Sequence, residues 1–345
     1  FYQRKQLQKI DFSNESILIN ICNNAFSYSL IKSIKIPSSV EFIDESAFEH
    51  CENLVNVEFS ENCNLHAIGK RAFSYSPIKS ITIPPSVRYI DESAFEHCKD
   101  LVNVEFSGNS NLHTIGIGAF SYSSITSITI PSSVEYISES AFERCENLSG
   151  IIFANNSQLI NIYKKAFCYS SIESVSIPPS VKMIGESAFQ SCGKLSNVEF
   201  SDESNLCIID KLAFSSTAIE KITIPSSIKN IGACVFHCCS KLDVVNFLYN
   251  SNLCTIGGQS FSNSSIVDIK IPQHVKEINE YAFSGCNKLR EVIFADDFEL
   301  VNIDKFAFAS SSIENIRIPR SVKKIGQAAF SCCKKLQKVI FNEIS

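Results

Sequence analysis

The chain has 345 residues, of which 45% are hydrophobic and 19% charged, and its formal net charge is -5 at pH 7. This weakly acidic balance provides no basic surface, so neither nucleic acid nor acidic lipid is expected as a partner. No apolar run approaches the roughly 18–20 residues that a membrane-spanning helix needs, so direct membrane insertion by this segment is not expected either.

The sequence repeats every 47 residues. Phenylalanines mark the register without insertion or deletion, at Phe12, Phe59, Phe106, Phe153, Phe200, Phe247, Phe294 and Phe341. A fixed period of this length is the signature of a solenoid, whose units bury their apolar faces by stacking on their neighbours. The pattern predicts a single uninterrupted array over 1–345, with seven units in 7–335 and partial coils at 1–6 and 336–345. Because neither end carries a polar cap, we expect a fragment of a longer chain.

Each unit divides into two similar coils, and each coil opens with a short strand. In IKSITI (78–83), Ile81 is expected to point inward while Ser80 and Thr82 point outward, following the two-residue alternation of a β-strand. Stacking of the coils would align these strands in a parallel sheet of about 15 short strands.

The rest of the coil follows in a constant order. In every second coil a proline such as Pro84 comes directly after the strand, and it is expected to end the strand because it lacks an N–H. An extended stretch (86–90) comes next, and DESAFEHC (91–98) is then predicted to form one or two helical turns. The predicted fold class is therefore an α/β repeat solenoid.

Phenylalanine is the expected core filler. Of the 26 phenylalanines, 15 recur at one position of the coil, from Phe1, Phe26 and Phe48 through to Phe330. Eight more end the first strand of each unit. Both series are predicted to stack ring on ring inside the solenoid, and this periodicity favours a core role over a ligand platform.

Seven of the 15 cysteines form a second series, here called the cysteine ladder. They fall three residues after the core phenylalanine in every second coil: Cys51, Cys98, Cys145, Cys192, Cys239, Cys286 and Cys333. Serine or threonine takes the same place in the alternate coils. Cysteines two coils apart should lie about 10 Å from each other, beyond the limit of about 7 Å for a disulfide, so buried thiols are expected. The other cysteines lack the CxxC pairs of a zinc site, and no metal or cofactor is predicted.

No catalytic motif occurs in the sequence, and a repeat makes the same surface many times, so no enzyme is expected. The outward strand residues are the remaining candidates for ligand binding. They are Lys35, Glu58, Thr82, Glu105, Thr129, Ser176, Glu199, Thr223, Lys270, Ile293 and Arg317. The alternative is a solvated face without a ligand. If one stretch contacts a protein, the basic and apolar C-terminal part is the predicted one. Glycosylation sequons occur at Asn14, Asn147, Asn155 and Asn263.

The segments IPSSVEFIDESAFEHCENL (36–54) and IPPSVRYIDESAFEHCKDL (83–101) closely resemble the BspA-type leucine-rich repeat. The resemblance covers essentially the whole chain and implies a right-handed leucine-rich-repeat superhelix with its sheet on the concave face. Such repeats occur in surface antigens of host-associated bacteria and of protists such as trichomonads and Entamoeba. The resemblance therefore implies a non-enzymatic module, at the cell surface or secreted, that binds a host or microbial surface protein. The alternative is a cytoplasmic leucine-rich-repeat scaffold or adaptor with an intracellular partner.

Overall fold

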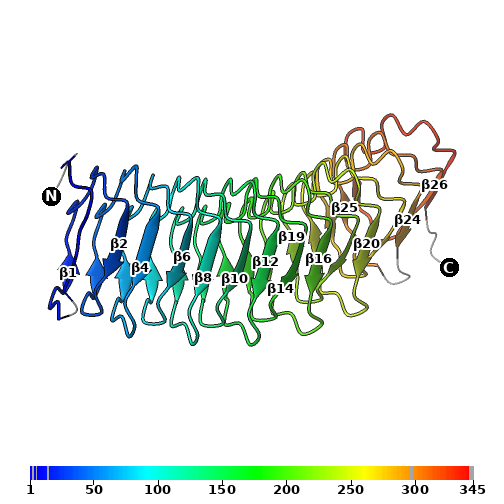
Figure 1. The fold of residues 1–345 in the computed structure, drawn as a ribbon. Coiled ribbons are helices and arrows are strands. Elements are labelled where there is room, and N and C mark those ends of the chain that lie inside the picture. The colour runs from blue at the N-terminus through cyan, green and yellow to red at the C-terminus, as the bar shows by residue number, and fades with distance from the viewer. Residues whose placement is uncertain (2–3, 5, 14, 295–297, 342–345) are drawn as a thin grey trace. The chain divides into compact units, whose positions relative to one another are not determined.

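A four-residue strand and a two-residue strand alternate along the chain and are joined by turns (Figure 1). The structure is a computed structural model and describes residues 1, 4, 6–13, 15–294 and 298–341. These residues form two compact units, 1–172 and 173–345, and each unit is a stretch of parallel β-solenoid. That the whole chain is one uninterrupted array remains a prediction.

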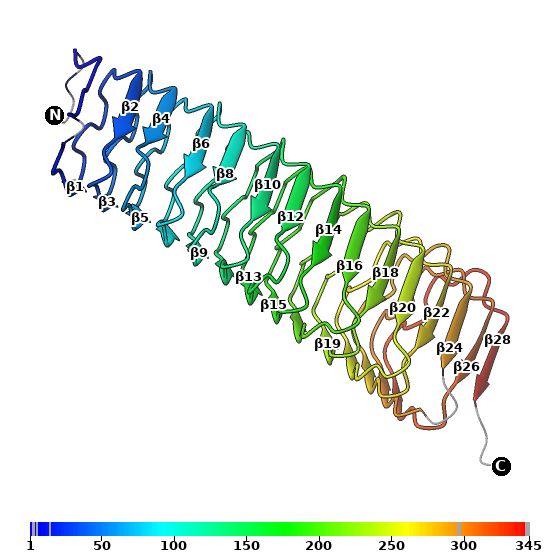
Figure 2. The ribbon, with the colours of Figure 1, turned by 60° about the horizontal axis from the view of Figure 1, so that its bottom comes forward.

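In residues 1–172 each series of strands pairs in parallel, coil on coil (Figure 2). The four-residue strands are β2 (Ser33–Ile36), β4 (Asn56–Phe59), β6 (Ser80–Ile83), β8 (Asn103–Phe106), β10 (Ser127–Ile130) and β12 (Gly150–Phe153). The two-residue strands are β1 (Asn20–Ile21), β3 (Phe42–Ile43), β5 (Ala67–Ile68), β7 (Tyr89–Ile90), β9 (Thr114–Ile115), β11 (Tyr136–Ile137) and β13 (Asn161–Ile162).

Residues 173–345 repeat this arrangement. The four-residue strands are β14 (Ser174–Ile177), β16 (Asn197–Phe200), β18 (Lys221–Ile224), β20 (Val244–Phe247), β22 (Asp268–Ile271), β24 (Glu291–Phe294), β26 (Asn315–Ile318) and β28 (Lys338–Phe341). The two-residue strands are β15 (Met183–Ile184), β17 (Ile208–Ile209), β19 (Asn230–Ile231), β21 (Thr255–Ile256), β23 (Glu277–Ile278), β25 (Asn302–Ile303) and β27 (Lys324–Ile325).

The strand predictions are confirmed. Ile81 is buried while Ser80 and Thr82 are exposed, as the alternation requires. Pro84 directly follows β6, and a proline likewise follows β2, β10, β14, β18, β22 and β26. The described residues contain 14 four-residue strands, close to the predicted 15, and a second series of two-residue strands that the sequence had suggested only as extended chain.

The predicted helical turns, and with them the α/β class, are wrong, because the described residues contain no helix. In segment 91–98 the backbone N–H groups of Ser93, Phe95 and His97 donate to carbonyl oxygens of the following coil at 2.7–2.9 Å. Ser93 and His97 have φ values of 57° and 56°, which are left-handed and incompatible with an α-helix. Alternate N–H groups thus bond between coils, and those in between close tight turns, as from Glu96 to Ser93.

Stacked phenylalanines fill the interior of each unit, as predicted for the main series. Phe48, Phe73, Phe95, Phe120 and Phe142 are fully buried, and successive ring centroids lie 5.2–5.3 Å apart with interplanar angles of 2–9°. Such pairs contribute about 0.5–1.5 kcal/mol each beyond the burial of their area. The second phenylalanine series, whose members end every other four-residue strand, is only half-buried in β4, β8, β12, β16, β20 and β24. The expectation that they too would stack inside the solenoid is therefore wrong.

The cysteine ladder lies beside the phenylalanines. Cys51, Cys98 and Cys145 are fully buried, and each Sγ donates to the carbonyl oxygen of a core phenylalanine in the preceding coil at 3.1 Å. The serine of the alternate coil also contacts the cysteine, since Ser123 Oγ lies 3.4 Å from Cys145 Sγ. Cysteine and serine thus alternate because each offers a small side chain with a polar atom that satisfies a buried carbonyl.

Candidate functional site

The four-residue strands present one face of each unit to solvent (Figure 2). All eleven outward residues predicted as ligand-binding are exposed on it. Parallel register places some of them side by side on neighbouring strands: Lys35 beside Glu58, Thr82 beside Glu105, Ser176 beside Glu199 and Lys270 beside Ile293. The face is therefore a ladder of side chains about 4.8 Å apart. That it binds a ligand remains a prediction.

Asparagines hold the carboxylates of this face. Asn56 Nδ2 donates to Glu58 Oε1 at 2.8 Å, and Asn103 Nδ2 donates to Glu105 Oε1 at 2.9 Å. Asn197 and Glu199 repeat the pair in the second unit at 2.9 Å. The two residues are two positions apart on one strand, so both side chains point to the same side. The result is a set of oriented acceptors that recurs along the sheet.

Two shallow hollows of about 620 and 600 Å³ lie on this face in residues 1–172. The first is lined by Glu58, Phe59 and Thr82 among others, and the second by Glu105, Phe106 and Thr129, so corresponding positions differ by 47. The half-buried phenylalanine thus serves as the apolar wall of a recess that also has a carboxylate and a hydroxyl.

A row of stacked side chains, absent from the sequence-based predictions, runs along one corner of the coils in residues 1–172; its tyrosines are exposed, and its two histidines and its arginine are half-buried. We call it the aromatic edge; its members are Tyr28, His50, Tyr75, His97, Tyr122, Arg144 and Tyr169. The five rings up to Tyr122 stack at centroid distances of 4.4–4.8 Å. The guanidinium of Arg144 then lies 5.8 Å from the Tyr122 centroid and 4.6 Å from that of Tyr169.

The aromatic edge stands on unusual backbone. All seven members have φ between 53° and 59°, a left-handed conformation that costs an ordinary residue about 1–2 kcal/mol. Inter-coil hydrogen bonds hold it, as where Tyr75 N–H donates to Glu96 O at 2.9 Å. The 47-residue spacing of the tyrosines is the signal in the sequence that could have revealed the row.

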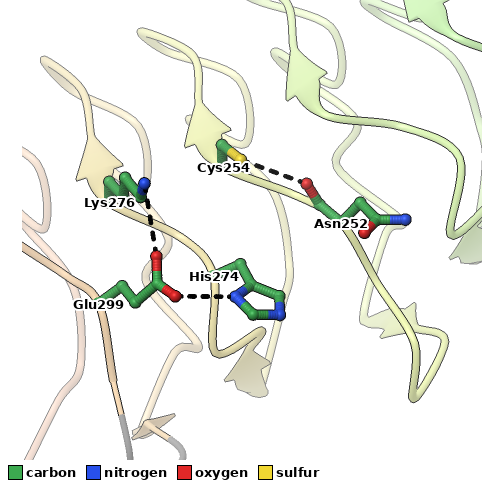
Figure 3. A network of polar contacts seen from close by, with 5 residues as sticks. All are labelled: Asn252, Cys254, His274, Lys276 and Glu299. Carbon is green, nitrogen blue, oxygen red and sulfur yellow. Dashed lines mark hydrogen bonds and ion pairs between the residues drawn. The ribbon is translucent and has the colours of Figure 1, made fainter.

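A polar network of titratable side chains lies on residues 173–345 (Figure 3). Glu299 accepts from His274 Nδ1 at 3.0 Å and pairs with Lys276 Nζ at 3.5 Å. The hydrogen bond from His274, aided by Lys276, lowers the pKa of Glu299 below its usual range. On the preceding coil, Cys254 Sγ donates to the carbonyl oxygen of Asn252, two residues earlier, at 3.4 Å and takes no part in this network. All three members of the trio lie at the surface, which is typical of a solvated ion pair.

Other candidate sites can be placed more briefly. Of the sequons, Asn147, Asn155 and Asn263 are exposed, and Asn14 lies outside the described residues, so glycosylation remains a prediction. Among residues that the structure describes, no three histidine, cysteine or acidic side chains gather in a way that could hold a metal ion. No helix long and apolar enough to cross a membrane is found in the same residues.

Comparisons with known proteins identify the repeat. A sequence profile of the BspA type leucine-rich repeat region (six copies) matches residues 1–101, 66–162, 160–290 and 254–345. A leucine-rich repeat protein from Bacteroides ovatus is similar in structure, with a TM-score of 0.73 and 27% identity over 93% of this chain and 76% of the other. No curated protein matches the chain.

Two further solved structures are similar at lower identity. The pneumococcal vaccine antigen PcpA gives a TM-score of 0.54 and 19% identity over 95% of this chain and 85% of its own, which supports the fold alone. A leucine-rich cell surface protein from Faecalibacterium prausnitzii gives a TM-score of 0.47 and 23% identity over 95% and 84%. Because the profile matches cover residues 1–345, the chain belongs to the BspA-type leucine-rich repeat family.

Proposed function

We propose that this chain is a non-enzymatic protein-binding module that is displayed at the cell surface and functions in adhesion. The observation that carries the proposal is the regular exposure of the outward strand residues in both units. A parallel sheet whose outer face is uncovered offers many equivalent contacts to a large partner, and repeated weak contacts add through effective concentration. Surface display is supported by the family, whose BspA-type members include surface antigens.

The contact stretch that we favour is on β22, β24 and β26. Lys270 lies beside Ile293 in the register of β22 and β24, Arg317 takes the same strand position on β26, and Ile293 is 40% exposed. Beside them on the same face, Asp268 and Glu291 form a parallel acidic pair. An exposed apolar residue between two cations fits a protein surface that presents a small apolar side chain with carboxylates on either side.

Surface display can be tested by antibody labelling of intact and permeabilised source cells. We expect labelling of intact cells at a level close to that of permeabilised cells, because a displayed module is accessible from outside. An antibody against a cytoplasmic protein serves as the control and should label only permeabilised cells. If this chain, like the control protein, is labelled only after permeabilisation, display at the cell surface is ruled out.

The contact stretch can be tested by reversing its charge. Beads coated with the chain should bind epithelial cells, and the double variant Lys270→Glu and Arg317→Glu should raise the apparent Kd about tenfold or more, because like charges opposed across an interface repel. The matched comparison is the single variant Lys270→Glu against Lys35→Glu, an exposed lysine at the corresponding strand position of the first unit. An equal effect of both variants, or of neither, would remove the C-terminal stretch from the proposal.

A second candidate function, an intracellular scaffold or adaptor, is favoured by one observation. Cys22, Cys207, Cys238 and Cys332 are exposed and outside any disulfide. Exposed thiols persist more readily in a reducing compartment than outside the cell. Labelling only after permeabilisation would select this function, and pull-down of partners from cell extract with the strand-face variants would then replace the adhesion assay.

A further inference from the structure

We propose that Cys238 is a reactive thiol that exchanges with low-molecular-weight disulfides, with the imidazole of His237 as its proton acceptor. Cys238 Sγ lies 3.2 Å from His237 Nε2, and Cys238 is exposed. The other ring nitrogen, His237 Nδ1, lies 2.6 Å from Ser262 Oγ on the following coil. A nucleophile, a base and a group that orients the base are thus aligned, which is the arrangement that activates a thiol.

The backbone holds this arrangement in place. Cys238 has a φ of 57°, and its N–H donates to the carbonyl oxygen of Ser262 at 2.9 Å. The left-handed conformation turns its side chain outward, whereas the next residue, Cys239, points into the core and donates to Phe214 O at 3.1 Å. Ser262 is itself 3% exposed, so the hydroxyl that orients the imidazole is fixed by packing.

The chemistry needs one particular tautomer of His237. When Nδ1–H donates to Ser262 Oγ, Nε2 presents its lone pair to the thiol proton of Cys238. The amide of Asn263 adds a donor, with Nδ2 at 4.0 Å from the sulfur. The Cys238 sulfur therefore has both the imidazole nitrogen, at 3.2 Å, and an amide N–H within reach.

The disulfide reagent is itself the oxidant in this exchange. The Cys238 proton moves to His237 Nε2, and Sγ attacks one sulfur of the reagent to form a mixed disulfide on Cys238. The S–S bond of the reagent breaks, its second sulfur leaves as a thiolate, and that thiolate takes the proton from the imidazolium. The thiol of Cys238 is oxidised, the reagent is reduced to one thiol, and no other oxidant is required.

The chain contains its own matched control. Cys332 lies 94 residues after Cys238, which is two repeat units, and it is exposed with a φ of 58°. Its preceding residue is Ser331, where Cys238 has His237. The two thiols therefore share a left-handed φ but differ in the preceding residue and in the coil that follows, where Cys238 meets Ser262 and Asn263.

The test is the modification rate of each thiol in the full chain at pH 7. Native protein is mixed with excess glutathione disulfide, samples are quenched with acid, and the mixed disulfides at Cys238 and Cys332 are measured by peptide mass spectrometry. We expect Cys238 to react about tenfold or more faster than Cys332, since a positioned base commonly accelerates proton transfer by larger factors than this. Equal rates in the unmodified chain would overturn the proposal without any variant.

Variants then assign the roles. His237→Gln should reduce the Cys238 rate to that of Cys332 and leave the Cys332 rate unchanged. Ser262→Ala should lower the Cys238 rate as well, and Ser262→Thr should restore it, because a hydroxyl again meets Nδ1. Absence of modification at the buried Cys286 in the same samples shows that each variant is folded. A His237→Gln protein whose Cys238 still reacts faster than Cys332 would also overturn the proposal.

Discussion

Replacing Phe95 by alanine should lower the free energy of unfolding by about 3–5 kcal/mol. Phe95 is fully buried, and its ring stacks on Phe73 at 5.3 Å and on Phe120 at 5.2 Å. The substitution leaves a cavity and breaks two stacked pairs at once. In a repeat array the loss is local, because each coil depends on its two neighbours. Urea unfolding followed by circular dichroism measures the change.

The matched control for this experiment is Thr82→Ala. Thr82 is exposed on β6, in the same coil as Phe95, and its replacement should change the free energy of unfolding by no more than about 0.5 kcal/mol. Similar losses for the two variants would contradict the assignment of inside and outside faces, and with it the whole register of side chains.

Alkaline solution should destabilise the chain through the cysteine ladder. Burial raises the pKa of Cys98 and of Cys145 from 9.0 to about 12, and that of Cys51 and of Cys286 to about 11. Since burial favours the neutral thiol, each cysteine contributes stability that is fully present below pH 9 and is lost as the pH rises toward its folded-state pKa. The difference between 9.0 and about 12 is equivalent to about 4 kcal/mol for one thiol.

A serine variant isolates this effect from other groups that titrate at high pH. Serine does not ionise in this range, and Ser76 already occupies the corresponding place in an alternate coil, where its Oγ donates to Phe48 O at 2.9 Å. The triple variant Cys51→Ser, Cys98→Ser and Cys145→Ser should unfold at a pH at least about half a unit higher than the parent chain. Tyrosines and lysines are the same in both proteins, so an unchanged midpoint would show that the buried thiols do not ionise on unfolding.

The sequence analysis placed the repeating parts of the fold well. The 47-residue spacing, the prolines after alternate strands and the alternation around Ile81 predicted parallel strands with the observed inside and outside faces. Each of these signals depends on a backbone rule that acts within one coil, and the period then applies the rule to every coil. All eleven residues predicted for the strand face are exposed for the same reason.

The prediction of helical turns was wrong because the composition of these segments is compatible both with a short helix and with turns that bond to the following coil. DESAFEHC (91–98) has residues that a short helix accepts, but the N–H of Phe95 donates to Ala119 O at 2.8 Å instead of within the segment. That partner lies 24 residues away, so no local propensity encodes the choice. The neighbouring coil decides it, and the left-handed φ of Ser93 and His97 follows from that pairing.

The sequence by itself determined the coiled repeat, the register of its strands and the main phenylalanine series that fills its core, because these depend on periodic hydrophobic burial. Only the tertiary structure decided which side chains from different coils meet. The aromatic edge stacks His50 on Tyr75, and the thiol site aligns His237 with Ser262, each pair 25 residues apart. Such contacts depend on the distance and register between neighbouring coils, and no single segment of the sequence encodes these.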